Sequence, residues 1–448
     1  MEVNKNDEVR IYIDGYTSEG AGVGRIGKYP VFIPNTVRGD YILCRIVKPG
    51  KTFAWGKCME ILTPSEERTE PICPHFYECG GCAIMHMSEK ERAYFKKDKV
   101  KNAFSHIAGM DIEVADTATA EETGYRNKTQ MPVASDYTQA MYKNRTNTKV
   151  SVPHCVIQDE SAKKVTEIIL SYLKEKKIPP YEPTERRGVV RHVYTRVSKS
   201  TGEILAVIIA TEKIDLKGLE TPLRKANVAA LVLNINEKHT NTILGDKSVT
   251  VFGKNFITDR LCGTDFDIYP DSFFQVNKYL TEQLYNKAVK LCHLTGKETV
   301  FDLYCGAGTI TAALSKGAKK VIGVEIVPSA VKSAKYSLER AGITNAEIYE
   351  GASEIVAPKL IEEGEKADVV VVDPPRKGCG EELLCAIAKM KPERIVYVSC
   401  DVATLARDAK YLSEHGYTVE KAYPFDMFPF THHVECIVRF CREELKCL

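Results

Sequence analysis

The sequence lacks a long hydrophobic run, an excess of charge of either sign, internal repeats and low-complexity segments. The 62 basic and 60 acidic residues give a formal net charge of +2. This balance argues against a protein coated in basic side chains, although a local basic stripe would suffice to bind a nucleic acid. No stretch reaches the roughly 18 apolar residues of a membrane span, and residues 1–7 lack the apolar region of a signal peptide. We therefore expect a soluble, cytoplasmic protein without a membrane partner.

The chain does contain many apolar residues and many cysteines. Hydrophobic residues make up 44% of the 448 positions, which excludes wholesale disorder and leaves room for two to four domains. Fifteen cysteines in a cytoplasmic protein indicate reduced thiols, metal ligands or catalytic groups rather than disulfides.

Three regions differ in their hydrophobic pattern. Residues 1–62 alternate short apolar strands with glycine-rich turns, which predicts a small closed β-barrel. Residues 72–265 predict a central α+β domain, with a helix near residues 159–177 and a cluster of cysteines. Residues 270–448 alternate buried strands with amphipathic helices, the pattern of a doubly wound α/β domain.

A glycine turn follows a buried strand at residues 298–309, Glu-Thr-Val-Phe-Asp-Leu-Tyr-Cys-Gly-Ala-Gly-Thr. Gly306 and Gly308 let the backbone approach a ligand closely. The next predicted strand ends at Glu325, where a carboxylate can bind both ribose hydroxyls. The third glycine of the dinucleotide-binding pattern is missing, because position 311 is Thr. The loop therefore favours an adenosyl ligand without phosphates over NAD, and an ordinary turn is the alternative.

Two further apolar runs end in reactive side chains. The first ends in Asp373-Pro374-Pro375-Arg376 and the second in Cys400. The carboxyl ends of strands in such a sheet face one ligand crevice, so we expect Asp373 and Cys400 there. Methyltransferases of amino groups usually carry an aromatic residue after the two prolines, to stack the base. Arg376 stands there instead, where some enzymes that methylate carbon 5 of cytosine in RNA carry a second cysteine.

Cys400 and Glu435 together suit methylation of carbon 5 of uracil. That carbon cannot attack a methyl sulfonium unaided, but a thiolate that adds to carbon 6 gives it carbanion character. A base must then remove the carbon-5 proton, so that the thiolate leaves. Taken singly, Cys400 could be a buried structural cysteine and Glu435 a capping or surface acid. We expect His432 and His433 to point apart on a strand, which favours structural or RNA-contacting roles over a metal site.

Several segments together carry a family resemblance. They are Phe273-Phe-Gln-Val-Asn, Asp302-Leu-Tyr-Cys-Gly-Ala-Gly-Thr, Asp373-Pro-Pro-Arg-Lys-Gly, Ser399-Cys-Asp, Thr404-Leu-Ala-Arg-Asp and His433-Val-Glu. With them, the chain resembles the RNA uracil-5-methyltransferase family over nearly its whole length. The resemblance implies that Cys400 is the nucleophile and Glu435 the base. It also implies that S-adenosylmethionine is bound by Gln275, Tyr304, Glu325 and Asp373. One departure is Asp401-Val402, because members of the family commonly have Asn-Pro after the nucleophile.

A set of cysteines in the central region has the spacing of metal ligands: Cys73, Cys79, Cys82 and, as the candidate fourth, Cys155. Gly80 and Gly81 let the backbone fold back, so that two thiolates can reach one centre. The spacing alone allows zinc or an iron–sulfur cluster, although zinc ribbons usually pair two C-x-x-C knuckles. The ribosomal-RNA branch of the resembled family carries a 4Fe-4S cluster with this layout. The resemblance therefore implies an iron–sulfur cluster, with a structural or RNA-shaping role rather than a redox one.

Two parts of the chain are candidate RNA contacts. Residues 1–62 resemble a TRAM domain in Glu19-Gly-Ala-Gly-Val-Gly-Arg-Ile-Gly and Pro30-Val-Phe-Ile-Pro, and small barrels of this kind commonly bind RNA. A candidate phosphate-contacting stripe, for which a solvated face is the alternative, consists of Arg186, Arg187, Arg191, Arg196 and Lys199.

We therefore predict a monomeric, three-domain enzyme that forms 5-methyluridine in large-subunit ribosomal RNA. Its cofactors would be S-adenosylmethionine and a 4Fe-4S cluster, and its partner the ribosomal RNA or its precursor. Transfer RNA is the rival substrate, against which the cysteine set and the barrel argue, because the familiar bacterial transfer-RNA enzymes lack both. A rival of another class is an iron–sulfur RNA-binding assembly factor with an inactive methyltransferase domain.

Overall fold

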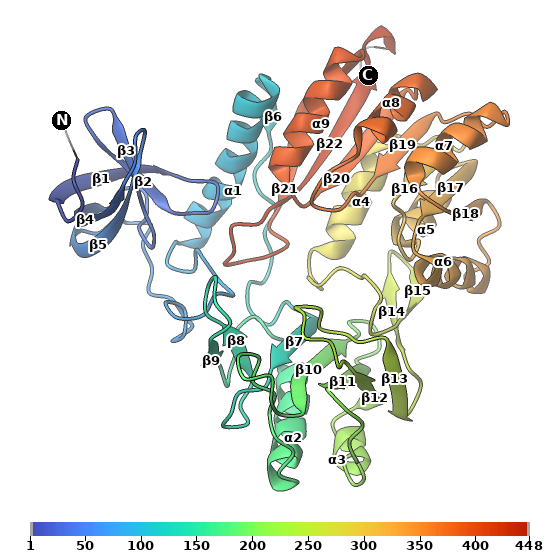
Figure 1. Ribbon diagram of the computed structural model, residues 1–448. Coiled ribbons are helices and arrows are strands. Elements are labelled where there is room, and N and C mark those ends of the chain that lie inside the picture. Colours follow the sequence, from blue (N-terminus) through green and yellow to red (C-terminus); the bar gives the residue numbers. More distant parts are fainter. Residues whose placement is uncertain (1–2, 446–448) are drawn as a thin grey trace.

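The structure is a computed structural model that describes residues 3–445, so the outermost residues of the first and last predicted domains lie outside it. Figure 1 shows a small barrel on one side, an eight-stranded sheet covered by helices at the top and a five-stranded sheet below. Within residues 3–445, no helix is long and apolar enough to cross a membrane.

The N-terminal segment forms a closed barrel in the order β1-β2-β3-β5-β4, as predicted. Its strands are β1 (Glu8–Tyr16), β2 (Gly22–Ile26), β3 (Tyr29–Ile33), β4 (Tyr41–Pro49) and β5 (Ala54–Thr63). Strand β2 lies in a glycine-rich segment that the sequence indicated as a turn. A Cβ at Gly24 would lie 2.1 Å from Ile11 Cγ2 and 2.7 Å from the Tyr12 carbonyl oxygen, so the tight barrel wall requires glycine there.

Polar contacts attach the barrel to helix α1 (Glu89–Ala103). The carboxylate of Glu91 accepts hydrogen bonds from the Tyr16 hydroxyl at 2.8 Å and from the Arg38 guanidinium at 2.9 Å. The ring of Phe95, one helical turn further on, meets the Tyr16 ring edge to face. The barrel is therefore held on α1 by a charged hydrogen-bond network as well as by chain connectivity.

The middle of the chain builds a mixed sheet in the order β13-β12-β11-β10-β7. Its strands are β7 (Lys128–Pro132), β10 (Val190–Val197), β11 (Ile204–Ala210), β12 (Val228–Ile235) and β13 (Lys247–Phe252). Helices α2 (Glu160–Glu175) and α3 (Glu220–Lys225) contribute to its apolar core. Helix α2 agrees with the expected helix and is capped at its N-terminus by Asp159, whose side chain accepts from Ser161 N. Two hairpins complete this part: β8 (Ala140–Tyr142) with β9 (Lys149–Ser151), and β14 (Ile257–Leu261) with β15 (Thr264–Ile268).

The C-terminal region forms an eight-stranded sheet in the order β18-β17-β16-β19-β20-β22-β21-β6. Five neighbouring strands run parallel: β16 (Thr299–Leu303), β17 (Lys320–Glu325), β18 (Ala346–Glu350), β19 (Val369–Val372) and β20 (Arg394–Ser399). Strand β22 (Glu435–Arg442) then pairs antiparallel with β20 on one side and with β21 (Tyr417–Phe425) on the other. The helices of this region are α4 (Thr281–Leu291), α5 (Thr309–Ser315), α6 (Pro328–Arg340), α7 (Ser353–Glu362), α8 (Glu381–Met390) and α9 (Val402–Glu414). Separate apolar clusters on the two faces of the sheet confirm the predicted doubly wound arrangement.

An earlier segment of the chain also joins this sheet. Helix α1 continues into the π-helix η1 (Phe104–Ala108) and packs against α9. Strand β6 (Glu113–Val114) then pairs in parallel with β21 at the sheet edge. Residues 89–114 thus pack with the C-terminal sheet, although in sequence they follow directly after Cys73, Cys79 and Cys82.

Candidate active site

Cys400 and Glu435 lie opposite each other at one end of the eight-stranded sheet. In the antiparallel pair β20–β22, Ser399 is the partner of Cys436, so the next positions in this register are Cys400 and Glu435. Glu435 is only 4% exposed, whereas the Cys400 thiol is half-buried. Strand register therefore brings together two residues that are 35 positions apart in the sequence.

The acid–base properties of this end of the sheet are unusual. Burial raises the pKa of Cys400 to about 11, with the Glu435 and Asp373 carboxyls adding to the rise and the Arg376 guanidinium opposing it. Burial and Asp373 likewise raise the pKa of Glu435 to about 8, and burial raises the pKa of Asp373 to about 7. Burial and the closeness of several acidic groups both favour the uncharged forms of Cys400, Glu435 and Asp373. A ligand carrying positive charge would shift the thiol and the carboxyls toward their ionised, reactive forms.

The turn after β19 is held rigidly in front of this pair. Gly378 has a φ of +75°, and the Thr404 hydroxyl donates to the Arg376 carbonyl at 3.2 Å. Arg407 donates to the Lys377 carbonyl at 3.0 Å, and the buried Asp408 carboxylate accepts from Cys379 N at 2.9 Å. Helix α9 therefore fixes the prolines and Arg376 relative to the thiol.

The loop that holds Cys400, between β20 and α9, has its own local support. The Asp401 side chain caps α9 by accepting from Ala403 N at 2.9 Å and from Thr404 N at 3.2 Å. The Ser399 hydroxyl accepts from Asp401 N at 3.1 Å. An aspartate is among the best N-capping residues, so the departure from Asn-Pro leaves a well-anchored helix start directly after Cys400.

The glycine turn after β16 lies beside the same sheet edge. Tyr304, Gly306 and Gly308 all have positive φ, at 65°, 55° and 78°. The Glu325 carboxylate accepts from Gly306 N at 3.0 Å and from Val327 N at 2.8 Å. The carboxylate thus braces the turn, which is open enough that a Cβ on Gly306 would meet no atom within 4 Å.

Gln275 comes from a separate segment that links the two larger sheets. Its carbonyl accepts from Asn127 Nδ2 at 3.1 Å, and Asn277 Nδ2 donates to the Met427 carbonyl at 3.2 Å. Gln275 itself is 5% exposed. The segment 274–278 therefore connects the central sheet with the loop that precedes Glu435.

Two buried residues of the site were missed by the sequence analysis. Asp302 is fully buried, accepts from the Thr311 hydroxyl at 2.5 Å and has a second carboxyl oxygen without a partner. Burial raises its pKa to about 7, and Asp373 and Glu325 add to the rise. Burial also raises the pKa of the Tyr285 hydroxyl, with further contributions from Asp373 and Glu435. Asp302 precedes the glycine turn and could have been noticed, but nothing local in the sequence marks Tyr285.

Comparisons with known proteins agree with this arrangement. The model of the tRNA (Uracil-5-)-methyltransferase family matches residues 89–443. An uncharacterized RNA methyltransferase of Clostridium tetani is 42% identical over 98% of this chain and 97% of its own. One from Listeria innocua is 40% identical over 97% and 98%. The crystal structure of Pyrococcus abyssi tRNA (uracil-54, C5)-methyltransferase in complex with S-adenosyl-L-homocysteine matches with a TM-score of 0.78 at 25% identity, covering 96% and 99%.

The chain belongs to the tRNA (uracil-5-)-methyltransferase family. It is therefore an S-adenosylmethionine-dependent RNA methyltransferase, as the sequence predicted. The match to the Pyrococcus structure spans nearly the whole chain, so the similarity includes the sheets that build the site.

The predicted cysteine set of this methyltransferase lies in loops. Three of its thiols, those of Cys73, Cys82 and Cys155, pack against one small apolar cluster. Burial raises the pKa of Cys82, and the other three thiols add to the rise. Across residues 3–445, however, no group of three or more cysteine, histidine or acidic side chains is arranged to hold a metal ion. The thiols are neighbours, but the structure does not show the predicted cluster site.

The prediction that five basic residues between 186 and 199 form one exposed stripe is wrong. Arg191 and Arg196 are 7% and 1% exposed. Arg191 donates to three backbone carbonyls at 2.6–3.2 Å, and Arg196 donates to Tyr194 Oη at 3.2 Å, so both stabilise the fold. The remaining members, Arg186, Arg187 and Lys199, are exposed. Side chains along β10 point alternately to the two faces of the sheet, and both faces are buried. A count of charges along the sequence cannot reveal that burial.

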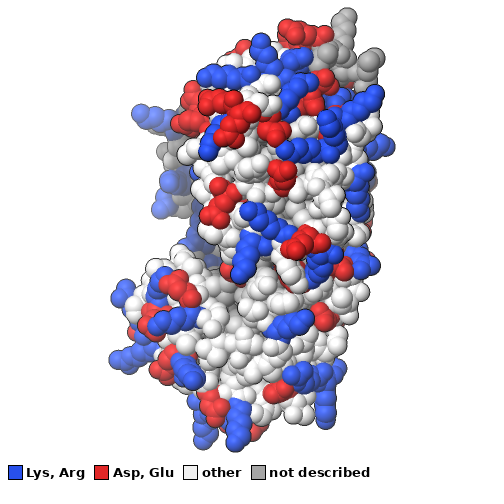
Figure 2. Space-filling view, turned by 90° about the vertical axis from the view of Figure 1, so that its right-hand side faces the viewer, with Lys and Arg blue, Asp and Glu red and all other residues white. Residues whose placement is uncertain are grey.

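The face drawn in Figure 2 has no coat of one charge, because basic and acidic side chains are interspersed over it. This agrees with the small net charge.

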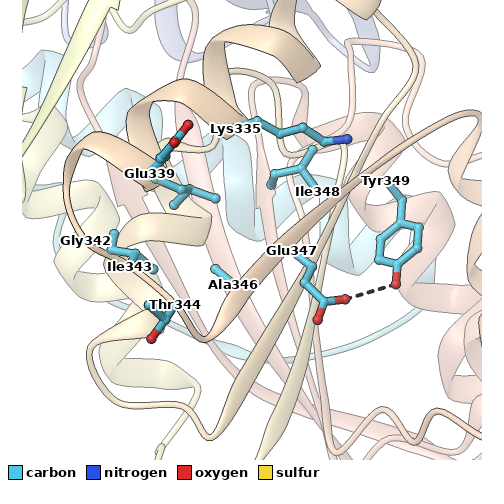
Figure 3. Close-up of a pocket in the computed structure, with 10 residues that line it drawn as sticks. Lys335, Glu339, Gly342, Ile343, Thr344, Ala346, Glu347, Ile348 and Tyr349 are labelled. Atoms are coloured by element: carbon cyan, nitrogen blue, oxygen red, sulfur yellow. Dashed lines mark hydrogen bonds between the residues drawn. The ribbon is translucent and has the colours of Figure 1, made fainter.

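A cavity of about 530 Å³ lies between α6 and β18 (Figure 3). Charged side chains at its mouth include Lys335, Glu339 and Glu347, and the Tyr349 hydroxyl donates to Glu347 at 3.0 Å. None of the predicted donor-binding residues lines this cavity.

Proposed function

We propose that this methyltransferase forms 5-methyluridine in large-subunit ribosomal RNA through a covalent Cys400 adduct. The observation that supports it most directly is the placement of Cys400 opposite Glu435 at a sheet edge rich in carboxyls. The reaction requires a thiol that can reach carbon 6 of the uracil ring and a base that can reach the proton on the neighbouring carbon 5. An inactive assembly factor would not require this pair beside an open glycine turn.

The residues around the glycine turn fit S-adenosylmethionine, a ligand without phosphates that carries a positive sulfonium and a positive ammonium. In this proposal, Gln275, Tyr304, Glu325 and Asp373 bind it. Burial raises the pKa of Asp302, and the Asp373 and Glu325 carboxyls add to this rise, so a cationic ligand beside them would relieve the repulsion at Asp302. The donor supplies an electrophilic methyl group; the remaining chemistry belongs to the side chains of the chain.

The half-buried Cys400 thiol gives its proton to solvent water, and its sulfur bonds to carbon 6 of uracil, which moves an electron pair toward carbon 5 and the carbonyl oxygen at position 4. Carbon 5 then takes the methyl group. The Glu435 carboxylate accepts the proton from carbon 5, the carbon 5–carbon 6 double bond forms again, and the sulfur leaves. Because Glu435 is buried, water is excluded from the proton that it takes.

The choice of ribosomal RNA rests on the cysteine set and the barrel of residues 1–62, which we propose to be a TRAM-like RNA-binding module. Transfer RNA is the second candidate, favoured by the name of the matching family and by the substrate of the Pyrococcus enzyme. The central region 72–265 and the catalytic region 270–448 would work together on either RNA.

We further propose that Cys73, Cys79, Cys82 and Cys155 hold a 4Fe-4S cluster. Four thiols suit such a cluster, and these four are neighbours: burial raises the pKa of Cys82 and of Cys155, and the nearby cysteines add to both rises. Methyl transfer consumes no electrons, so the cluster would stabilise the loops. Anaerobic purification should give about four irons and four sulfides per chain; stoichiometric zinc would contradict the proposal.

Two measurements test the function. Wild-type protein should form a covalent adduct, stable on denaturing gels, with RNA that contains 5-fluorouridine, because fluorine cannot leave as the proton does. Mapping of 5-methyluridine in a deletion strain should then show a loss in large-subunit ribosomal RNA. Loss in transfer RNA alone would select the second candidate, and the absence of any adduct would refute the covalent mechanism.

A further inference from the structure

Basic side chains gather beside the Cys400–Glu435 pair. A terminal nitrogen of the Arg376 guanidinium lies 3.5 Å from His433 Nε2. The rings of His432 and His433 have centroids 4.3 Å apart, and Lys99 Nζ donates to the His432 carbonyl at 2.8 Å. From the sequence we expected the two histidines to point apart on a strand. This expectation is wrong, because both residues precede β22 in a loop and their rings lie together. We call Arg376, His432, His433 and Lys99 the basic cluster.

Carboxyls lie near the basic cluster, because Asp401 and Glu19 oppose the fall in the pKa of Lys99 and Arg376 opposes the rise in the pKa of Glu435. Among residues 3–445, no ion pair joins Arg376 or Lys99 to a carboxylate. Burial lowers the pKa of His433 to about 4, and His432, Arg376 and Lys99 lower it further. Burial lowers the pKa of Lys99 to about 8. A bound anion would offset the positive charge of Arg376 and Lys99.

Local structure also fixes the cluster in place. Arg376 follows two prolines, and its carbonyl accepts from the Thr404 hydroxyl. The backbone N–H of His433 donates to the Thr431 hydroxyl at 3.3 Å, and the Phe428 ring meets the His433 ring edge to face. The Arg376 side chain itself is exposed. An anion arriving from solvent would thus meet an exposed guanidinium on a fixed stretch of backbone.

We propose that the basic cluster binds a phosphate of the RNA backbone next to the target uridine, with Arg376 as the principal contact. The inference rests on the proposed function, because it places a phosphate where a uridine would enter the Cys400 site. A guanidinium can hold two phosphate oxygens at once, and a neutral imidazole N–H can donate to a third. Unstacking a base costs a few kcal/mol, and a phosphate contact beside the site would help to offset that cost.

Arg376 could instead act on the uracil itself, because its guanidinium lowers the pKa of both Cys400 and Glu435. The two roles differ in what they change. A phosphate contact acts on binding and on its salt dependence, whereas a cation that stabilises charge on the ring acts on turnover.

The test measures binding of a labelled single-stranded RNA that contains the target uridine, without methyl donor, at several salt concentrations. Arg376→Gln should weaken binding about tenfold and lower the slope of log affinity against log salt by about 0.7–0.9, the value of one phosphate contact. Arg376→Lys should restore most of the slope, because it keeps the charge. Lys332→Gln, which removes an exposed cation on α6, is the matched control and should leave the slope unchanged.

An unchanged slope for Arg376→Gln, with a lower kcat and the same KM for RNA, would overturn the inference and assign Arg376 to the ring. Equal donor affinity and equal melting temperature in all variants exclude misfolding as the cause. The result is separable from the proposed function. If the slope falls but wild-type protein forms no 5-fluorouridine adduct, the phosphate site stands and the covalent mechanism fails.

Discussion

Two half-buried thiols of this protein, those of Cys400 and Cys82, have raised pKa values for different reasons. Burial together with two carboxyls raises the pKa of Cys400, and a nearby guanidinium opposes the rise. Burial together with three other thiols raises the pKa of Cys82. Mixed charge beside a single thiol suits reaction with a substrate, whereas several thiols beside one another suit a shared metal centre. The neighbours of a cysteine, not its burial, thus distinguish the two roles that we propose.

The scaffolds of these two groups differ as well. Cys400 is fixed by the register of β20 with β22 and by the Asp401 cap of α9. The cysteines at 73, 79 and 82 lie in a loop outside any sheet, which backbone hydrogen bonds such as Gly80 N to the Tyr142 carbonyl at 3.0 Å hold in place. A site on strand ends is formed before any ligand arrives, whereas a loop site depends more on what it binds.

The sharpest test of the contrast is removal of the single thiol. Cys400→Ala should lower methyl transfer by about 10⁴-fold or more, because no other group can bond to carbon 6. Donor affinity, measured by calorimetry, should stay within a few-fold. Cys58→Ala, which removes a half-buried thiol of the barrel, should keep full activity. Substantial turnover by Cys400→Ala would mean that the thiol is structural.

Removal of the base should stop the reaction at a later step. Glu435→Gln should accumulate a methylated covalent RNA adduct on denaturing gels and lower turnover about 10²–10⁴-fold, because proton removal follows methyl transfer. The exposed Glu347→Gln is the matched control and should form no stable adduct. Normal turnover by Glu435→Gln would require another base.

The pH dependence of that step follows from the raised pKa of Glu435. The carboxyl is protonated below its pKa of about 8 and cannot accept a proton in that form. Breakdown of the wild-type adduct in single-turnover experiments should therefore speed up as pH rises, along a limb with a pKa no higher than about 8. This limb should disappear in Glu435→Gln; a rate that falls as pH rises from 6 to 8 would contradict the assignment.

Loss of one thiol from the multi-cysteine group should act on stability rather than on chemistry. Cys82→Ser should remove the iron and lower the melting temperature by about 5 °C or more, because a bound centre stabilises only the folded state. Cys58→Ser should change neither. Iron content and thermal unfolding under anaerobic conditions measure both effects, and an unchanged melting temperature in an iron-free variant would show that the loops need no metal.

The smallest expected effect concerns the helix cap beside Cys400. Asp401→Ala should cost about 1 kcal/mol of unfolding free energy, because two N–H groups of α9 lose their acceptor. Asp401→Asn should restore most of it, as measured by urea unfolding. Equal stability of all three proteins would mean that the cap contributes nothing and that strand register alone fixes Cys400.

Much of the site could be predicted from the sequence because its signals are local. A glycine turn after an apolar strand, two prolines after Asp373 and a cysteine after another strand each mark a strand end, and strand ends meet at one edge of such a sheet. The closed barrel and helix α2 were predictable for the same reason. By contrast, charge counting failed for Arg191 and Arg196, because burial depends on which elements pack over a strand.

The sequence by itself determined the order of strands and helices and the family, since hydrophobic periodicity and short motifs are written along the chain. Only the tertiary structure decided that Glu435 faces Cys400, that Asp302 and Tyr285 add to the site and that His432 and His433 meet Arg376. It also decided that residues 89–114 join the catalytic sheet. The physical reason is that register and packing join distant segments through contacts whose free energy depends on both partners, so neither segment encodes the contact alone.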